Sequence, residues 1–393
     1  MRVAIFADSY TSSWETKDTG ELVLGLQELK HECDILAVLG EQESTQPGKF
    51  SVTYLSEANI QDSHFWASTP YDLVICYTWL REKYLPLLRA IKKSGKKVIV
   101  KGDTDGRYNF PVNPRWGQDI VPVFSLAYAR ILLRKLKRLL WARAYMQDLI
   151  NHIEIIDRLV VESPGAYSNI SGILAYAKRP DLVSKISSIQ NPVGTSAITR
   201  DISAKTKMVV CVGEWTRVVG EALQKNTKCM INVLSDFLKI ESEYEVIIIG
   251  AMGPLEKMFP KLSKSQRSRL HLLGKVSHHD MLGYVEKAQV FFMPSMTEGF
   301  SIAASEAVAL GCSIVGTPIE CLTYLARGGV GGTISFDFKS NAVLGALLAD
   351  TERWKGGVYS PFEISQFWRQ RLSSKVIAQL ILDSAFPDVP SQI

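Results

Sequence analysis

The chain has 393 residues, which is long for a single hydrophobic core and favours two domains. Its composition, with 46% hydrophobic and 22% charged residues, is typical of a soluble globular protein. The net charge of +5 is too small to indicate a nucleic-acid partner. No apolar run approaches the roughly 18–20 residues of a membrane span.

The first half of the chain alternates short apolar runs with helical stretches. Because the runs are apolar almost throughout, they predict parallel strands that are covered on both faces. Helices are expected between them, for example over 20–30. Since a strand starts the chain and Asp8 follows it, no signal peptide is expected. The predicted strands are 2–8, 33–39, 72–78, 96–103 and 157–163.

The segment 126–145 is basic and has a helical pattern. It alternates Arg and Lys with Leu and Ile, contains Trp141 and has no acidic residue. Basic amphipathic helices with tryptophan bind anionic membrane surfaces. The alternative is a helix that packs its leucine face on the sheet and leaves its cations in solvent. The stretch is therefore a candidate membrane face, and nucleic-acid binding is not expected from it.

The polar segment 187–207 has no helical period and predicts a linker. A second set of strands follows it. Two such sets predict two doubly wound α/β domains, whose ligands bind beyond the carboxyl ends of the strands. These strands are expected at 208–214, 244–251, 270–276, 289–295 and 312–318, and helices at 227–239, 279–287 and 302–310. Six scattered cysteines without a CxxC pair indicate reduced thiols and no zinc site.

The stretch 293–316 places two acids among small residues. Glu298 lies in the predicted strand-to-helix loop, Ser301 is the expected N-cap, and Glu306 falls just over a turn into the helix. Free N–H groups at the helix start bind phosphate, and a nearby carboxylate can accept hydrogen bonds from sugar hydroxyls. The alternative is a helix whose acids only favour its amino end. His278 and His279 precede another predicted helix and are expected to be surface loop residues.

The motif "VFFMPSMTEGFSIAASEAVALGCSIVGTP", residues 290–318, resembles the signature of retaining GT-B glycosyltransferases of the family-4, or group 1, type. Further similarity runs through "RLHLLGKVSHHDMLGYVEKAQV", "VIIIGAMGPLEKM", "DRLVVESPGAYSNI" and "IQNPV". The resemblance implies two Rossmann-like domains facing across a cleft. It places an acceptor-side domain at 1–195, a nucleotide-sugar-binding domain at 196–370, and a last helix within 371–393 that packs back on the first domain.

The resemblance also assigns roles to residues of the second half. Glu306 is expected to hold the nucleotide ribose, and Glu298 to lie near the donor sugar. The loop Gly274, Lys275 and Val276 corresponds to the segment that reads the base. The backbone near the donor sugar and diphosphate corresponds to Gly299, Phe300, Ser301 and Ile302. No obligate metal and no cofactor are implied, because cations and helix ends neutralise the leaving diphosphate.

The sequence departs from the family pattern in "VGEWTRVVGEALQKNTK". Glu214 stands where the family commonly has an arginine that clamps the diphosphate, and Lys225 fits the family's second cation. Arg217 is the candidate replacement for the arginine, and a surface arginine is the alternative. In the first half no glycine-rich loop follows the first strand.

Asp103 and Asp105 lie in "KGDTDGR" at the end of a predicted strand, and one or the other is a candidate contact for donor or acceptor hydroxyls. The alternative is an Asp-Gly turn with solvated acids.

The predicted function is retaining transfer of a sugar from a UDP- or GDP-type nucleotide sugar to a hydroxyl of a glycan or lipid-linked acceptor. The expected location is cytoplasmic, with the inner face of the cell membrane as a candidate peripheral site. Glu214 motivates an alternative, a GT-B-like protein that binds nucleotide or sugar without turnover. A nicotinamide oxidoreductase is disfavoured because no strand is followed by GxGxxG.

Overall fold

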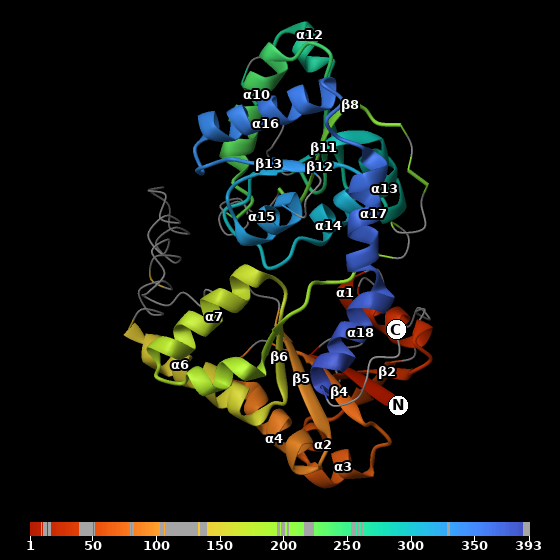
Figure 1. Ribbon diagram of the computed structural model, residues 1–393, viewed down its shortest axis with the longest axis vertical. Coiled ribbons are helices and arrows are strands. Elements are labelled where there is room, and N and C mark those ends of the chain that lie inside the picture. Colours follow the sequence, from red (N-terminus) through yellow and green to blue (C-terminus); the bar gives the residue numbers. More distant parts are fainter. Residues whose placement is uncertain are drawn as a thin grey trace. The chain divides into compact units, whose positions relative to one another are not determined.

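The computed structural model divides into two compact units, each described by itself below (Figure 1). The divisions fall after Gly194 and between Arg371 and Leu372. The structure describes residues 1–8, 10, 14, 17–38, 50, 52–78, 80, 82–102, 106, 133, 140–194, 197, 201–202, 204–215, 224–252, 257, 259–260, 262–327 and 331–387.

Unit 1 is built on a seven-stranded sheet with the order β3-β2-β1-β4-β5-β6-β7. All pairings between its described strands are parallel, and β1 pairs with β2 on one side and with β4 on the other. The order reverses at β1, as in doubly wound folds, so ligands are expected at the carboxyl edge. The strands are β1 (Arg2–Ala7), β2 (Glu32–Val38), β3 (Val52–Leu55), β4 (Leu73–Tyr77), β5 (Lys97–Gly102), β6 (Arg158–Val161) and β7 (Ile186–Ser188).

Helices cover both faces of this sheet, which explains why its strands are apolar throughout. On one face pack α2 (Glu57–Gln61), α3 (Ser63–Ser68), α4 (Leu85–Lys93), α6 (Ala142–Ile155) and α7 (Pro164–Tyr176). On the other face pack α1 (Asp18–Glu28) and α18 (Ser374–Ala385). The 3-10 helix η2 (Glu82–Tyr84) lies between β4 and α4, and η3 (Pro180–Lys185) lies between α7 and β7.

The helix α18 comes from the end of the chain and packs against α1. The Ser374 hydroxyl donates a 2.8 Å hydrogen bond to the buried Glu21 carboxylate. Gly25 permits the close approach, because a Cβ there would lie 2.1 Å from the Ser374 carbonyl oxygen. The sequence therefore uses a small residue to seat its last helix on the first domain.

Asp157 joins three elements of unit 1 and predicts a pH-dependent contribution to stability. It accepts hydrogen bonds from Lys92 at 2.5 Å and from the Val98 amide at 2.9 Å. Burial raises the pKa of Asp157, but these bonds outweigh it and leave the pKa below its ordinary value of 3.8. Asp157→Asn should lower the free energy of unfolding by about 1–2 kcal/mol at pH 7.

A depressed pKa contributes stability above the unfolded value that is lost as the pH falls through the folded value. The difference between wild type and Asp157→Asn should therefore close below about pH 4 in urea unfolding. Asp236→Asn is the control, since Asp236 forms an exposed pair with Lys239 at 2.7 Å and should change stability by less than about 0.5 kcal/mol. A difference for Asp157→Asn that persists at low pH would contradict this account.

Unit 2 is built on a six-stranded parallel sheet with the order β10-β9-β8-β11-β12-β13. Its order reverses at β8, next to β11, which places a switch point between these two strands. The strands are β8 (Thr206–Val212), β9 (Glu245–Ile249), β10 (Leu270–Gly274), β11 (Ala288–Met293), β12 (Ser313–Gly316) and β13 (Gly332–Ile334).

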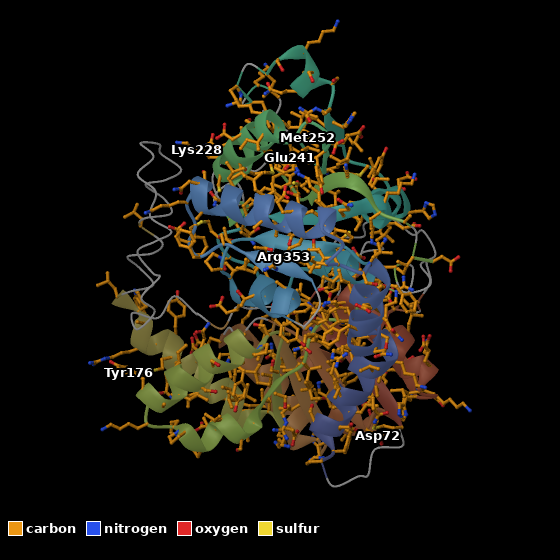
Figure 2. All side chains as sticks on the ribbon, turned by 45° about the horizontal axis from the view of Figure 1, so that its top comes forward. Asp72, Tyr176, Lys228, Glu241, Met252 and Arg353 are labelled. Carbon is orange, nitrogen blue, oxygen red and sulfur yellow. The ribbon has the colours of Figure 1, made fainter. Side chains whose placement is uncertain are left out.

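Helices again cover both faces of the sheet (Figure 1). On one face pack α10 (Thr227–Ile240) and α16 (Ser340–Lys355), and Lys355 donates to both oxygens of Glu241, labelled in Figure 2. On the other lie α13 (His278–Lys287), α14 (Ile302–Ala309) and α15 (Glu320–Arg327). The short α12 (Lys264–Arg267) precedes β10, and α17 (Pro361–Leu372) precedes α18.

All ten strands predicted from the sequence are present, and the two-domain parallel architecture is confirmed. The predictions missed β3, β7 and β13, which are short strands at or near the sheet edges. All six cysteines are free. Among the described helices, none is long and apolar enough to cross a membrane.

Candidate active site

The site expected from the sequence lies at the carboxyl end of β11 in unit 2. The strand ends at Met293, and α14 begins at Ile302 as predicted. The Ser301 hydroxyl accepts a hydrogen bond from the Ala304 amide at 3.3 Å, so Ser301 is the N-cap that its side chain predicts. Glu298 lies in the intervening loop and Glu306 in the second turn of the helix.

Glu298 is held by two side chains from different segments. Lys225 Nζ lies 2.7 Å from Glu298 Oε1, and the Ser295 hydroxyl donates to the same oxygen at 2.7 Å. The Lys225 and Glu298 side chains are only 18% and 10% exposed, so water screens the ion pair weakly. Two residues that are 73 positions apart and were predicted separately are thus brought together.

The segment that carries Lys225 is fixed against the loop. The Met296 amide donates to the Gln224 carbonyl oxygen at 2.7 Å. Asn226 adopts the left-handed conformation, with φ of 52°, and α10 begins directly after it. Asparagine tolerates this conformation better than most residues. The backbone therefore fixes Lys225 directly before the N-cap of α10 and against the loop that carries Glu298.

Glu306 is 2% exposed and has a partner that the sequence analysis missed. His278 Nε2 lies 2.7 Å from Glu306 Oε1. This separation is a hydrogen-bond distance between the imidazole ring and the carboxyl group. The expectation that His278 is a surface loop residue is wrong, because His278 begins α13 and its side chain turns to a buried acid. His279 is exposed as expected, with 84% of its side chain accessible, but it also lies in α13 and not in a loop.

The expected base-reading loop leads directly to this contact. Gly274 ends β10 with φ of +70°, and its carbonyl oxygen accepts from the Gly250 amide at 2.8 Å. Lys275 is exposed and Val276 half-buried. A short turn therefore connects Gly274, the last residue of β10, to His278, the residue that contacts Glu306.

The loop from Gly299 to Ile302 is anchored by a buried side chain. The Phe300 side chain is buried, with its ring 6.3 Å from that of Tyr324, so it anchors the loop in the core. Burial raises the pKa of Cys321, the Glu298 charge adds to this rise, and a hydrogen bond with the Ser301 backbone opposes it. The outward direction expected for the four amides stays a prediction.

Of the other residues expected in the site, the structure describes Glu214 but not Arg217 or Asp103. Glu214 follows β8 and is exposed, and the neighbouring Trp215 is pinned by a 2.8 Å hydrogen bond from its amide to the Ala251 carbonyl oxygen. Arg217 and Asp103 lie outside the described residues, as does most of the segment 126–145. Among the residues that the structure describes, no group of three His, Cys, Asp or Glu side chains could hold a metal ion.

The His278 contact predicts a role in binding the nucleotide. Hydrogen bonds to charged groups contribute about 1.5–3 kcal/mol, so His278→Ala should weaken binding of the expected nucleotide, UDP or GDP, about tenfold, because Glu306 loses the group that orients it. His278→Gln keeps an N–H donor and should retain most of the affinity. Calorimetric titration with both nucleotides measures both variants, with His279→Ala as the exposed control. Equal affinities of wild type and His278→Ala for the nucleotide that binds would contradict the role.

Comparison with solved structures shows the class of fold. The chain is similar over its whole length to Anabaena HepE in complex with UDP, at 12% identity and a TM-score of 0.62, covering 98% of this chain and 99% of that one. It is similar to sucrose-phosphate synthase from Thermosynechococcus elongatus, at 13% identity and a TM-score of 0.59, with 97% of each chain covered. A UDP-forming α,α-trehalose-phosphate synthase from Burkholderia vietnamiensis gives 10% identity and a TM-score of 0.63, covering 98% and 99%. The fold is therefore GT-B.

A family model narrows the class further. Residues 206–348, which contain β8 to β13, the first part of α16 and the whole described site, match the family "Glycosyl transferases group 1". The stretch 206–348 is therefore similar to the group 1 glycosyl transferases, and the fold of the chain is GT-B. No curated protein is similar enough to this chain to count as a relative.

Proposed function

We propose that this protein transfers a sugar, with retention of configuration, from a nucleotide-diphosphate sugar of the UDP or GDP type to an acceptor hydroxyl. The observation that carries the proposal is the ion pair of Lys225 with Glu298, which lies in the loop that leads into α14. An ammonium group and the amides of a helix start both favour a diphosphate. The solved structures of similar fold that contain UDP or UDP-glucose support the choice of donor.

In this proposal Glu306 accepts hydrogen bonds from the ribose hydroxyls and His278 orients it. Glu298 holds Lys225 in place and lies next to the donor sugar. As the bond from the sugar to the diphosphate breaks, negative charge grows on the leaving oxygen, and Lys225 with the helix start stabilises it. Arg217 would add a second cation in place of the arginine that Glu214 replaces. Attack from the same face would retain the configuration without a metal ion or an enzyme nucleophile.

A panel of nucleotide sugars, assayed for released nucleoside diphosphate in the presence of a chelator, tests the proposal. One donor should give release that Glu306→Ala reduces at least tenfold, and NMR of the first product should show the donor's anomeric configuration. Release that is unchanged in Glu306→Ala would argue against the assigned site. Inverted product would overturn the retaining mechanism alone.

The acceptor belongs to the same proposal. We infer a glycan or lipid-linked acceptor held by unit 1, with action on the cytoplasmic side of the membrane. The basic composition of 126–145 and the exposure of Leu140 and Trp141, at 82% and 57%, support a peripheral membrane face. Sedimentation with anionic vesicles but not with neutral ones is the expected result.

A second candidate function is nucleotide binding without turnover. The observation that favours it is the exposed Glu214 after β8, where the family pattern has a cation. An anion at this place would oppose the leaving diphosphate. Nucleotide binding by calorimetry with no release across the donor panel would support this candidate over the enzyme.

A further inference from the structure

A second cavity lies in unit 1, apart from the residues of the proposed donor site. Its volume is about 480 Å³, within the range of small-molecule sites. One wall comes from η2, which follows the carboxyl end of β4, and the other from the first two turns of α6. The carboxyl edge of a doubly wound sheet is where such folds bind ligands. The lining residues are Glu82, Trp141, Ala144, Tyr145, Gln147 and Asp148.

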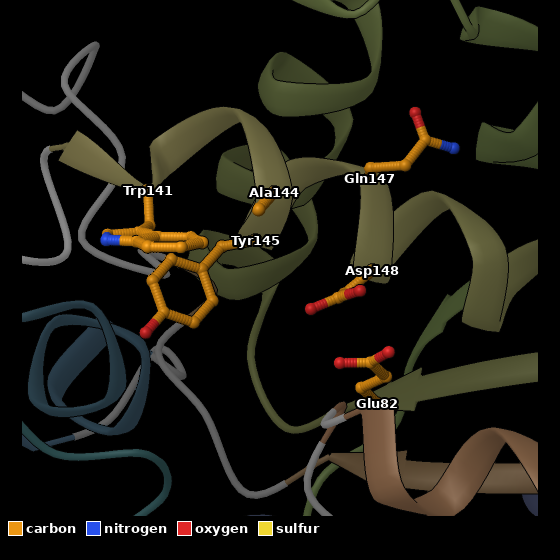
Figure 3. Close-up of a pocket in the computed structure, with 6 residues that line it drawn as sticks. All are labelled: Glu82, Trp141, Ala144, Tyr145, Gln147 and Asp148. Carbon is orange, nitrogen blue, oxygen red and sulfur yellow. The ribbon is translucent and has the colours of Figure 1, made fainter.

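Helix geometry aligns the α6 wall. The Tyr145 amide donates to the Trp141 carbonyl oxygen at 3.0 Å, so the two residues are one turn apart. Asp148 follows three positions later on the same face. Figure 3 shows the Trp141 and Tyr145 rings next to each other and the carboxylates of Asp148 and Glu82 directed toward one another.

The two rings are exposed and lie next to each other at the cavity. Trp141 is 57% exposed and Tyr145 is 45% exposed. Burying an aromatic side chain is strongly favourable, so two adjacent open rings at a cavity indicate a surface that a ligand covers. An aromatic face carries partial negative charge and attracts cations, and it also packs against the C–H face of a sugar ring.

The carboxylates add charge of one sign to this surface. No described cation forms an ion pair with Glu82 or Asp148. Lys83, the neighbour of Glu82 in the chain, pairs instead with Asp8 at 2.8 Å. Burial raises the pKa of Asp148, the nearby Glu82 charge raises it further, and His152 opposes both. The buried His152 ring itself bonds the Asp148 backbone carbonyl at 2.6 Å. A cation bound beside the two rings would reduce the repulsion between the two acids.

We propose that this cavity binds a primary ammonium group carried on a sugar-sized ring, as in an amino sugar. The ammonium would lie between Glu82 and Asp148, and the ring would cover Trp141 and Tyr145. A neutral sugar would leave the two carboxylates uncompensated, and a lipid headgroup would bring its phosphate toward them. This inference is independent of the proposed donor site, because none of the residues that line the cavity takes part in that site.

Saturation-transfer NMR on the full chain, with glucosamine and N-acetylglucosamine as probes, tests it. The two probes share a ring but only the first carries an ammonium group at neutral pH. Glucosamine should bind at least tenfold more tightly than N-acetylglucosamine, and added salt should weaken it. Glu82→Gln and Asp148→Asn should each raise the Kd for glucosamine at least tenfold. Glu57→Gln, which removes an exposed acid from α2 outside the cavity, should leave it unchanged.

Both cavity variants remove mutual repulsion, so their melting temperatures should not fall, and thermal unfolding checks this. Equal affinity for the two probes would overturn the proposal in favour of a neutral-sugar site. Glucosamine binding that survives both substitutions, or no glucosamine binding by the wild type, would also overturn it. UDP titration of the same samples reports on the donor site separately, so failure of one proposal is distinguishable from failure of the other.

Discussion

Replacing Lys225 with alanine is expected to lower kcat/KM for the nucleotide-sugar donor by about 10²–10³-fold. Loss of one group that stabilises developing negative charge has this magnitude in other enzymes. Lys225 is the cation that the structure places 2.7 Å from Glu298, in the loop before α14. Steady-state release of nucleoside diphosphate measures the effect. Lys228→Ala is the matched control, because Lys228 is exposed on α10 three residues away, labelled in Figure 2, and should change kcat/KM little.

A loss of folding is separable from a loss of catalysis. Lys225→Ala leaves the Glu298 carboxylate, 10% exposed, without its cation, which costs stability. The double variant Lys225→Met with Glu298→Gln removes both charges and keeps the side-chain volume, so its free energy of unfolding should approach that of wild type. It should nevertheless remain as inactive as Lys225→Ala. Activity within threefold of wild type in either variant would contradict the assigned role.

Gly250→Ala should destabilise unit 2 by about 3 kcal/mol or more. Gly250 follows β9 with φ of +124°, a conformation that disfavours any side chain. A Cβ there would lie 1.7 Å from the Gly213 carbonyl oxygen, a backbone atom that cannot move aside without shifting the end of β8. The Gly250 amide also donates to the Gly274 carbonyl oxygen, so the carboxyl ends of β8, β9 and β10 meet at this residue.

Gly345→Ala is the matched control for this substitution. Gly345 lies within α16, and a Cβ there would meet no atom within 4 Å. Alanine is the better helix former, so Gly345→Ala should stabilise unit 2 by about 0.5–1 kcal/mol. Urea unfolding compares the two, which should differ in sign. A Gly250→Ala protein as stable as wild type would show that the close approach of β8 and β9 does not constrain the fold.

The strands and the acidic loop were predictable because they depend on local patterns. Apolar runs covered on both faces predict parallel strands wherever they occur, and Ser301 before a helical stretch predicts an N-cap. The strand β13 was not predictable in this way, because it has three residues, begins at Gly332 and is stabilised by pairing with β12. The strand β7 likewise has only three residues and falls in the stretch that reads as a linker.

The partners within the site depend on tertiary contacts. Lys225 and Glu298 were each expected from a motif, but nothing in either motif predicts that the two side chains pair. His278 was missed because the residue that it contacts lies 28 positions away on another helix. The signal that could have found it is its place directly after the expected base-reading loop, at the first position of α13. Glu82 in η2 and Asp148 in α6 lie 66 positions apart and belong to no sequence motif, so nothing in the sequence predicts that both line one cavity.

The central claim is that Glu306 and the loop before α14 bind the nucleotide of the donor. Calorimetric titration of UDP and GDP into wild type and Glu306→Ala tests it most directly. The account predicts that one of the two nucleotides binds the wild type and that Glu306→Ala raises its Kd at least tenfold while the melting temperature shows a folded protein. Binding of neither nucleotide, or the same Kd in both proteins, would contradict it.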